Sequence, residues 1–260
     1  MSIINTYGKG PYNIVLLHGG PGAIGEMQPV AKHLSSKFGV LEPLQSKYSI
    51  KELIEELKDS IQKNSDIPVI LVGYSWGAWL AVIFASIYPE LVRKVVLISS
   101  GPFEQKYVST MNQTREKRMT RGDRKTLEQL SKEFQDPNID KKETMIKMGV
   151  LYNRLDSYST IPHELSSLIL DLDMYNKIWP EASMMRETGE LLEHLKQISC
   201  PIIAIHGDYD GHPAKGVKEP LEKHSRNSKF ILLRNSGHTP WYERKAKSKF
   251  YDILEEVLED

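Results

Sequence analysis

The sequence predicts an α/β protein in which a mostly parallel sheet is flanked by helices and a helical segment is inserted between two late strands. Short apolar runs without alternation recur along the chain, as expected of strands that are buried on both faces of a parallel sheet. Amphipathic segments of helical period lie between several of these runs. Strands that alternate with helices form parallel sheets with right-handed crossovers.

The composition is typical of an ordinary globular protein. The chain has 260 residues, of which 40% are hydrophobic and 26% are charged, and its formal net charge is +0. This length fits one α/β domain with an insertion, or two small domains. A neutral chain has no electrostatic attraction to nucleic acid or to an acidic membrane, so we expect neither as a partner.

The single cysteine and the first residues of the chain indicate the cellular compartment in which the protein is expected. Cys200 is the only cysteine, which excludes an internal disulfide and a zinc cluster built on cysteines. The opening residues, MSIINTYGKGPYN, lack the basic start and apolar core of a secretory signal. A reducing, cytoplasmic location is therefore expected.

Five apolar runs are predicted as buried strands, and Gly39–Leu41 is a weaker sixth candidate. The five are Asn13–Leu17, Pro68–Val72, Lys94–Ile98, Pro201–Ile205 and Lys229–Leu233.

Two segments carry clear helix signals. SIKELIEELKDSIQK begins with Ser49 and Glu52, the pattern of a capping box, and then places apolar residues on one face. TPWYERKAKSKFYDILEEVLE offers Thr239 as an N-cap and Pro240 at the first helical position. We therefore expect a helix from each of these starts.

The uncharged run from Ile67 to Pro89 is long enough to cross a bilayer, which needs about 20 apolar residues. Gly73 and Gly77 also form a G-x-x-x-G, a spacing found where membrane helices pack closely. The order of elements favours another interpretation, in which the run divides at these glycines into a buried strand and a buried helix. No second hydrophobic segment or strong basic flank supports a membrane span.

Between Gly101 and about Leu195 the predicted strands stop, and charged helical stretches such as TLEQLSKEFQD appear. We interpret this part as a helical insertion. Its basic stretch, Gln113–Lys125, is interpreted as a solvated helix face. Its methionines could line an adaptable apolar pocket, but gap-filling between short helices is the favoured interpretation. These are Met111, Met119, Met145, Met148, Met174, Met184 and Met185.

The residues GYSWG, from Gly73 to Gly77, have the G-x-S-x-G pattern of a turn that presents a nucleophilic serine. A serine hydroxyl needs a base to remove its proton and donors to stabilise the oxyanion. A sharp turn between strand and helix would hold the Ser75 hydroxyl clear of the sheet. Small residues two before and two after the serine avoid collisions with neighbouring backbone.

The segment LLHGGPG follows the first of the five strands, where a loop can aim a backbone amide at the oxyanion. Pro21 has no N–H, so the expected donors are the amides of Gly20 and of Trp76, the residue after the nucleophile. The alternative is a tight turn that merely uses its glycines. The strand that precedes the segment favours the oxyanion role.

The acid and the base of such a site are expected on loops after late strands, in the order serine, acid, histidine. His238 in SGHTPWYE follows the last predicted strand. In AIHGDYDGHP, Asp208 and Asp210 both have suitable chemistry. We favour Asp210, because Asp208 is placed to form a turn at the strand end.

His206 and His212 lie close to Asp210 in the sequence and raise a His/Asp metal site as an alternative. Such a site would leave Ser75 and His238 without a role. We therefore expect neither a metal ion nor a cofactor.

Four motifs together resemble the α/β-hydrolase superfamily, and within it the prolyl iminopeptidase-like branch. They are HGGPG, G-x-S-W-G, the G-x-x-D from Gly207 to Asp210, and the GH of Gly237–His238. The resemblance runs from Asn13 to the C-terminus apart from the insertion. It implies an α/β-hydrolase fold and a catalytic triad of Ser75, Asp210 and His238, and it supports Asp210 because the family's acid lies three residues beyond that glycine.

The resemblance also implies that the insertion is a cap over the active site. The core is then residues 1–101 and 196–260, and the cap is residues 102–195. Iminopeptidases carry a longer N-terminal β-hairpin region, and their cap has a W-x-x-W-E element whose glutamate receives the substrate amine. Trp179 is the only tryptophan of the insertion here, and this element is missing.

The sequence therefore predicts a serine hydrolase that acts on a small amide or ester through an acyl-enzyme. HGGPG and G-x-S-W-G favour an aminopeptidase with a small-molecule or short-peptide substrate. The missing amine-binding element favours the alternative, a carboxylesterase or a related acyl or C–C bond hydrolase. A binding protein that keeps the fold without turnover is a third hypothesis, against which the intact triad and oxyanion loop argue.

Overall fold

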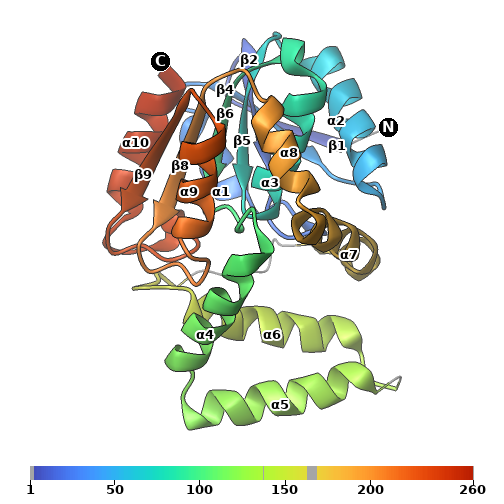
Figure 1. Ribbon diagram of the computed structural model, residues 1–260. Coiled ribbons are helices and arrows are strands. Elements are labelled where there is room, and N and C mark those ends of the chain that lie inside the picture. Colours follow the sequence, from blue (N-terminus) through green and yellow to red (C-terminus); the bar gives the residue numbers. More distant parts are fainter. Residues whose placement is uncertain (1–2, 137, 163–168, 260) are drawn as a thin grey trace.

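A seven-stranded sheet forms the centre of the computed structural model, which describes residues 3–136, 138–162 and 169–259 (Figure 1). The strand order is β1-β4-β2-β5-β6-β8-β9, and each neighbouring pair is parallel except β1 with β4. The predicted mostly parallel sheet is confirmed. The strands are β1 (Ile3–Tyr7), β2 (Tyr12–Leu17), β4 (Gly39–Leu44), β5 (Val69–Tyr74), β6 (Val92–Ile98), β8 (Ile202–Gly207) and β9 (Ser228–Leu233).

Each predicted strand corresponds to a strand of this sheet, but the sequence did not predict β1. The central strands are long apolar runs because helices cover both of their faces; all six residues of β5 are buried. β1 reads IINTY, is partly exposed, and pairs antiparallel with β4 at the edge of the sheet. Such an edge strand lacks the continuous apolar run that identified the others.

Helices cover both faces of the sheet. Alternate residues of each strand supply the two cores, so that Val15 and Leu17 of β2 face one helical layer and Ile14 and Leu16 face the other. The first layer contains α2 (Ile50–Asn64), α3 (Trp76–Ile87), α8 (Glu190–Gln197) and α9 (Lys215–His224). The second contains α1 (Gln28–Leu34) and α10 (Lys247–Glu259).

The uncharged run divides into β5 and α3 at Gly73–Gly77, as predicted. α3 is apolar on all sides because it packs against the sheet and against α2 and α8. A short 3₁₀ turn, η1 (Pro89–Leu91), follows it. In the part of the chain that the structure describes, no helix has the length and apolar character needed to cross a membrane.

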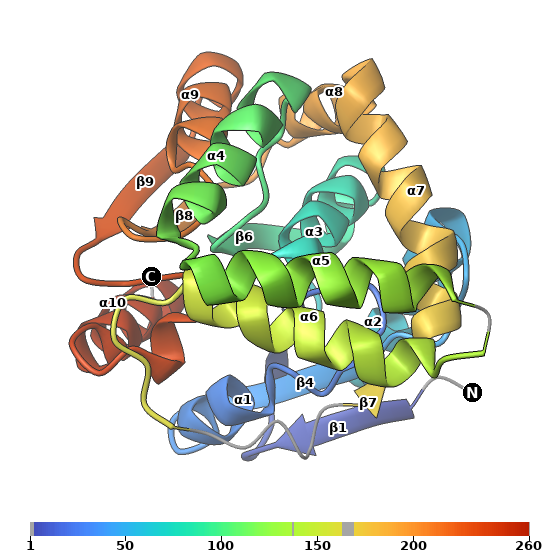
Figure 2. The same cartoon turned by 90° about the horizontal axis from the view of Figure 1, so that it is seen from below.

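The predicted insertion contains two differently packed parts. α4 (Val108–Arg118), α5 (Arg121–Gln135) and α6 (Lys141–Leu155) stand beyond the edge toward which the parallel strands point (Figure 1). A 3₁₀ turn, η2 (Gln105–Tyr107), precedes them, and α5 and α6 lie side by side across that edge (Figure 2). α7 (Leu172–Thr188) and α8 instead bury apolar side chains in the core beside α3. The protruding part of the predicted cap is therefore α4–α6.

A two-stranded ribbon links the loop after β2 to the insertion. Its strands are β3 (Ala23–Ile24) and β7 (Ile169–Leu170), which pair antiparallel.

The C-terminal helix begins later than the sequence predicts. Pro240–Tyr242 form a short 3₁₀ turn, η3, and α10 starts only at Lys247. Thr239 and Pro240 stand at the predicted N-cap and first positions, but of η3, and the Thr239 side chain makes no capping hydrogen bond. Its hydroxyl lies 3.1 Å from that of Tyr74 instead. The chain bends here because the buried carboxylate of Glu243 accepts backbone N–H groups, among them that of Gly237 at 2.8 Å.

Candidate active site

Ser75 occupies a strained turn between β5 and α3. Its backbone has φ 52° and ψ −113°, a conformation that is rare for residues other than glycine. The two glycines of the motif permit close backbone contacts. A Cβ on Gly73 would lie 2.2 Å from the carbonyl oxygen of Gly77, and a Cβ on Gly77 would lie 2.3 Å from that of Leu17. The structure thus places Ser75 at the turn that the sequence predicts.

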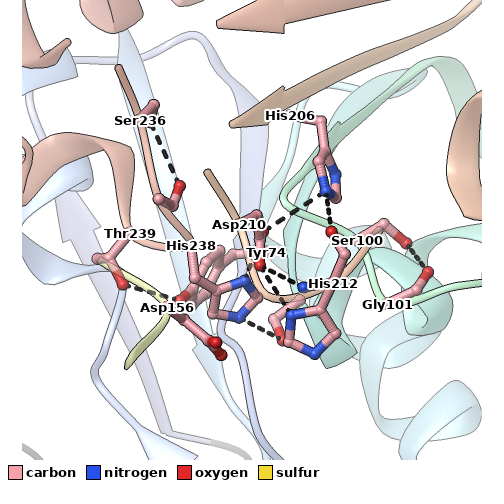
Figure 3. Close-up of polar contacts among 12 residues, drawn as sticks. Tyr74, Ser100, Gly101, Asp156, His206, Asp210, His212, Ser236, His238 and Thr239 are labelled. Atoms are coloured by element: carbon pink, nitrogen blue, oxygen red, sulfur yellow. Dashed lines mark hydrogen bonds and ion pairs between the residues drawn. The ribbon is translucent and has the colours of Figure 1, made fainter. Parts of the chain in front are cut away.

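The structure brings Ser75, His238 and Asp210 together in one chain of contacts. Nε2 of His238 lies 3.2 Å from Oγ of Ser75. Nδ1 of His238 lies 2.8 Å from Oδ2 of Asp210 (Figure 3). The three residues follow β5, β9 and β8, whose carboxyl ends lie at the same edge of the sheet. Asp208, the sequence alternative, instead faces the backbone N–H of Ser236 at 3.4 Å.

The charges at His238 and Asp210 suit a catalytic base that is hydrogen-bonded to a carboxylate. Burial of the ring disfavours the charged form of His238, but the charge of Asp210 and the hydrogen bond to it outweigh burial and raise the pKa of His238. Burial acts to raise the pKa of Asp210, yet its contacts with His238 and His212 hold that pKa well below its usual range. Asp210 is therefore ionised, and it stabilises a proton on His238.

The loop after β2 forms one wall of the site. Gly20 lines the cavity beside Ser75. Nδ1 of the buried His18 is 2.8 Å from the carbonyl oxygen of Gly19, and burial lowers the pKa of His18 to about 4, so this ring stays neutral. Trp76 is the first residue of α3, and N–H groups at a helix start have no partner within the helix. The oxyanion roles of Gly20 and Trp76 stay predictions.

A cavity of about 230 Å³ opens beside these residues. Gly20, Glu26 and Ser75 line it from the core, and Arg115 and Tyr152 line it from α4 and α6. No methionine is among its described lining residues.

Arg115 is a cavity residue whose position was predicted wrongly. It belongs to the basic stretch interpreted as a solvated face, but its side chain is only 16% exposed. Its Nε lies 3.1 and 3.0 Å from the two carboxylate oxygens of Asp156, which is buried at the end of α6. The backbone oxygen of Asp156 accepts the N–H of His238 at 2.9 Å. No local pattern reveals this pairing, because its members come from distant segments.

Glu26 is the second cavity residue that sequence reasoning missed. It follows β3, and its carboxylate packs against Gly19: a Cβ there would lie 2.6 Å from Oε2. Burial raises the pKa of Glu26 to about 7, although the charge of His238 and the Gly19 amide oppose this shift. Across the described residues, no basic side chain forms an ion pair with Glu26. Its place just after HGGPG is the one sequence signal that could have identified it.

One donor atom each of Asp210, His212 and His238 lies within 4.8 Å of the others, a grouping that could hold a metal ion. In the structure, both histidines hydrogen-bond to the Asp210 carboxylate. His206 joins this group through the carbonyl oxygen of His212, 2.9 Å from its Nε2. That the site works without a metal stays a prediction.

A family model described as the alpha/beta hydrolase fold matches residues 12–245. The chain belongs to the α/β hydrolase family. This membership makes the protein a hydrolase enzyme, of a family whose relatives include esterases and peptidases.

Two relatives of this hydrolase align over most of their length. A proline iminopeptidase of Heyndrickxia coagulans is 23% identical over 256 residues, which cover 88% of this chain and 85% of the relative. A pimeloyl-[acyl-carrier protein] methyl ester esterase of Salmonella newport is also 23% identical over 256 residues, covering 93% and 92%. Among solved structures, VinJ has a TM-score of 0.69 at 19% identity, over 99% of this chain and 94% of VinJ. The structural likeness establishes the fold.

Proposed function

We propose that this α/β hydrolase is a serine hydrolase that works through an acyl-enzyme. The contact chain from Ser75 through His238 to Asp210 carries the proposal. Nε2 of His238 takes the hydroxyl proton as Ser75 attacks an ester or amide carbonyl, and Asp210 stabilises the imidazolium that results. The amides of Gly20 and Trp76 stabilise the oxyanion. His238 then protonates the leaving group, and it activates the water that releases the acid.

We propose further that the substrate carries a free amine, which makes the enzyme an aminopeptidase of small substrates. Glu26 supports this because its carboxyl lines the same cavity as Ser75 and forms no ion pair with a basic side chain among the described residues. The other described carboxylate that lines the cavity, Asp156, is already paired with Arg115. A buried carboxylate without a cation is costly, so a substrate ammonium is the group that would stabilise it. The Heyndrickxia coagulans relative, named a proline iminopeptidase, is consistent with this substrate class.

A carboxylesterase is the second candidate. Two observations favour it: the Salmonella newport relative is named a methyl ester esterase, and the sequence lacks the W-x-x-W-E element of iminopeptidases. The same triad serves esters and amides, so the distinction depends on what the cavity binds.

The first experiment compares hydrolysis of a proline coumarylamide and of a neutral p-nitrophenyl ester, with Ser75→Ala as the blank. We expect Ser75→Ala to lose turnover of both substrates by about 10⁴-fold or more while remaining folded. Amide turnover above the blank supports the aminopeptidase. Ester turnover alone supports the esterase, and turnover by Ser75→Ala contradicts the serine mechanism.

A second prediction concerns Glu26. Glu26→Gln keeps the size of the side chain but removes its charge, so kcat/KM for an amino-acid ester should fall about 10- to 100-fold. The N-acetylated form of the same ester is the matched control and should change little. The Glu26 pKa is about 7 and α-amino groups titrate at about 7.7–8.0, so the preference for the amine should peak between these values and decline on either side. An equal loss on both esters would contradict the amine-binding role.

A further inference from the structure

Two imidazoles share the carboxylate of Asp210. Oδ2 is 2.8 Å from Nδ1 of His238, while Oδ1 accepts the backbone N–H of His212 at 2.8 Å and lies 2.9 Å from Nδ1 of the same residue (Figure 3). The Asp210 side chain is fully enclosed. Nε2 of His206 also lies 3.6 Å from Oδ2, beyond hydrogen-bond distance, so each carboxylate oxygen hydrogen-bonds to one histidine ring.

The ring of His212 is also in contact with the base. The His212 and His238 rings stack with their centroids 4.4 Å apart and their planes 27° apart. Both rings line the cavity that contains Ser75. The backbone of His212 is held in turn by His206 of β8, whose Nε2 is 2.9 Å from the His212 carbonyl oxygen.

The contacts fix the protonation of His212. A carboxylate only accepts hydrogen bonds, so Nδ1 of His212 carries the proton toward Asp210. Burial and the charge of His238 lower the pKa of His212, while Asp210 opposes this and Arg115 of α4 adds to it. A neutral ring therefore lies against His238, where a second positive charge would oppose formation of the imidazolium.

We propose that His212 is a positioning residue for the catalytic base: its Nδ1–H fixes the Asp210 carboxylate so that Oδ2 meets Nδ1 of His238. The hydrogen bond also draws part of the Asp210 charge away from His238 and so moderates its affinity for protons. This inference rests on the proposed function, in which His238 activates Ser75.

Two substitutions separate the hydrogen bond from the ring. His212→Asn keeps an N–H donor near the position of Nδ1 but removes the ring. His212→Phe keeps a ring to stack on His238 but removes the donor. The measurement is the rate of Ser75 labelling by a neutral fluorophosphonate between pH 5 and pH 9, together with kcat/KM for a neutral ester. Thermal unfolding of each variant reports whether it is folded.

We expect His212→Phe to lower the labelling rate and kcat/KM about 10- to 100-fold. Its acid limb should move to higher pH by about half a unit, because His238 then experiences more of the Asp210 charge. His212→Asn should recover most of the rate and the wild-type limb.

Three results would overturn or redirect the inference. Wild-type rates and an unmoved limb in His212→Phe would overturn it. Equal losses in both variants with an unmoved limb would assign His212 to packing alone and would also overturn it. Failure of the wild-type enzyme to label at all would instead contradict the proposed function.

Discussion

Ser75 and His238 illustrate how backbone position and charge combine at single residues. The positive φ of Ser75 directs its hydroxyl toward Nε2 of His238, and the enclosed Asp210 favours the protonated form of that ring. The raised pKa of His238 makes it a stronger base than an exposed histidine. It also means that His238 stays protonated up to a higher pH than an exposed histidine does.

The pH dependence of activity follows from the raised pKa of His238. His238 must be neutral to take the Ser75 proton, so kcat/KM for a neutral ester should fall as pH drops through a pKa above the usual 6.5. Asp210→Asn should lower kcat about 10⁴-fold and move the acid limb to lower pH, because the charge that raises the pKa is gone. An unmoved limb in Asp210→Asn would contradict the assignment of Asp210.

Sequence reasoning identified the site residues that stand in local patterns and missed those that do not. The turn around Ser75 is visible because Gly73 and Gly77 are required by contacts of 2.2 and 2.3 Å. Arg115 reaches the cavity from a helix position that carries no periodic or motif signal, and Glu26 is marked only by its place just after HGGPG. Their roles depend on which distant side chains they meet, and that is set only by the tertiary structure.

At the scale of elements, Glu243 joins the end of α6 to the loop that carries His238. Its buried carboxylate accepts the N–H groups of Gly237 at 2.8 Å, of Tyr158 at 2.7 Å and of Ser159 at 2.6 Å. In addition, the backbone N–H of His238 donates to the backbone oxygen of Asp156 at the end of α6. The protruding helices α4–α6 are thereby attached directly to the catalytic edge.

Replacing Glu243 tests this attachment. Glu243→Ala leaves the buried N–H of Gly237 and the part-buried N–H groups of Tyr158 and Ser159 without acceptors, so the free energy of unfolding should fall by about 2–4 kcal/mol. Glu256→Ala, a carboxylate substitution on α10, is the control and should change stability by less than about 0.5 kcal/mol. Urea denaturation measures both. Equal, small effects would show that Glu243 does not anchor the loop.

Glu243 also explains why one element boundary was predicted wrongly. Thr239 and Pro240 carry the signals of a helix start, and these local signals alone predict a helix that continues from there. The backbone instead bends around Glu243 before α10 begins at Lys247. Tertiary hydrogen bonds thus overrode a local signal, whereas the buried central strands, whose apolar runs are set by the core, were predicted close to their observed bounds.

At the scale of the whole molecule, sheet topology assembles the site. β2, β5, β8 and β9 are mutually parallel within one sheet, so the loops that carry Gly20, Ser75, Asp210 and His238 emerge at the same edge. α4–α6 stand over that edge (Figures 1 and 2), and Arg115 of α4 and Tyr152 of α6 line the cavity. The core supplies the proposed chemistry, and the protruding helices supply part of the binding wall.

The most direct test of the central claim is covalent labelling of the purified enzyme with a neutral fluorophosphonate, followed by peptide mass mapping. The account predicts one adduct, on Ser75, formed in parallel with loss of ester hydrolysis and absent from Ser75→Ala. An enzyme that hydrolyses the ester while Ser75 remains unlabelled, or an adduct on another residue that accounts for the lost activity, would contradict it.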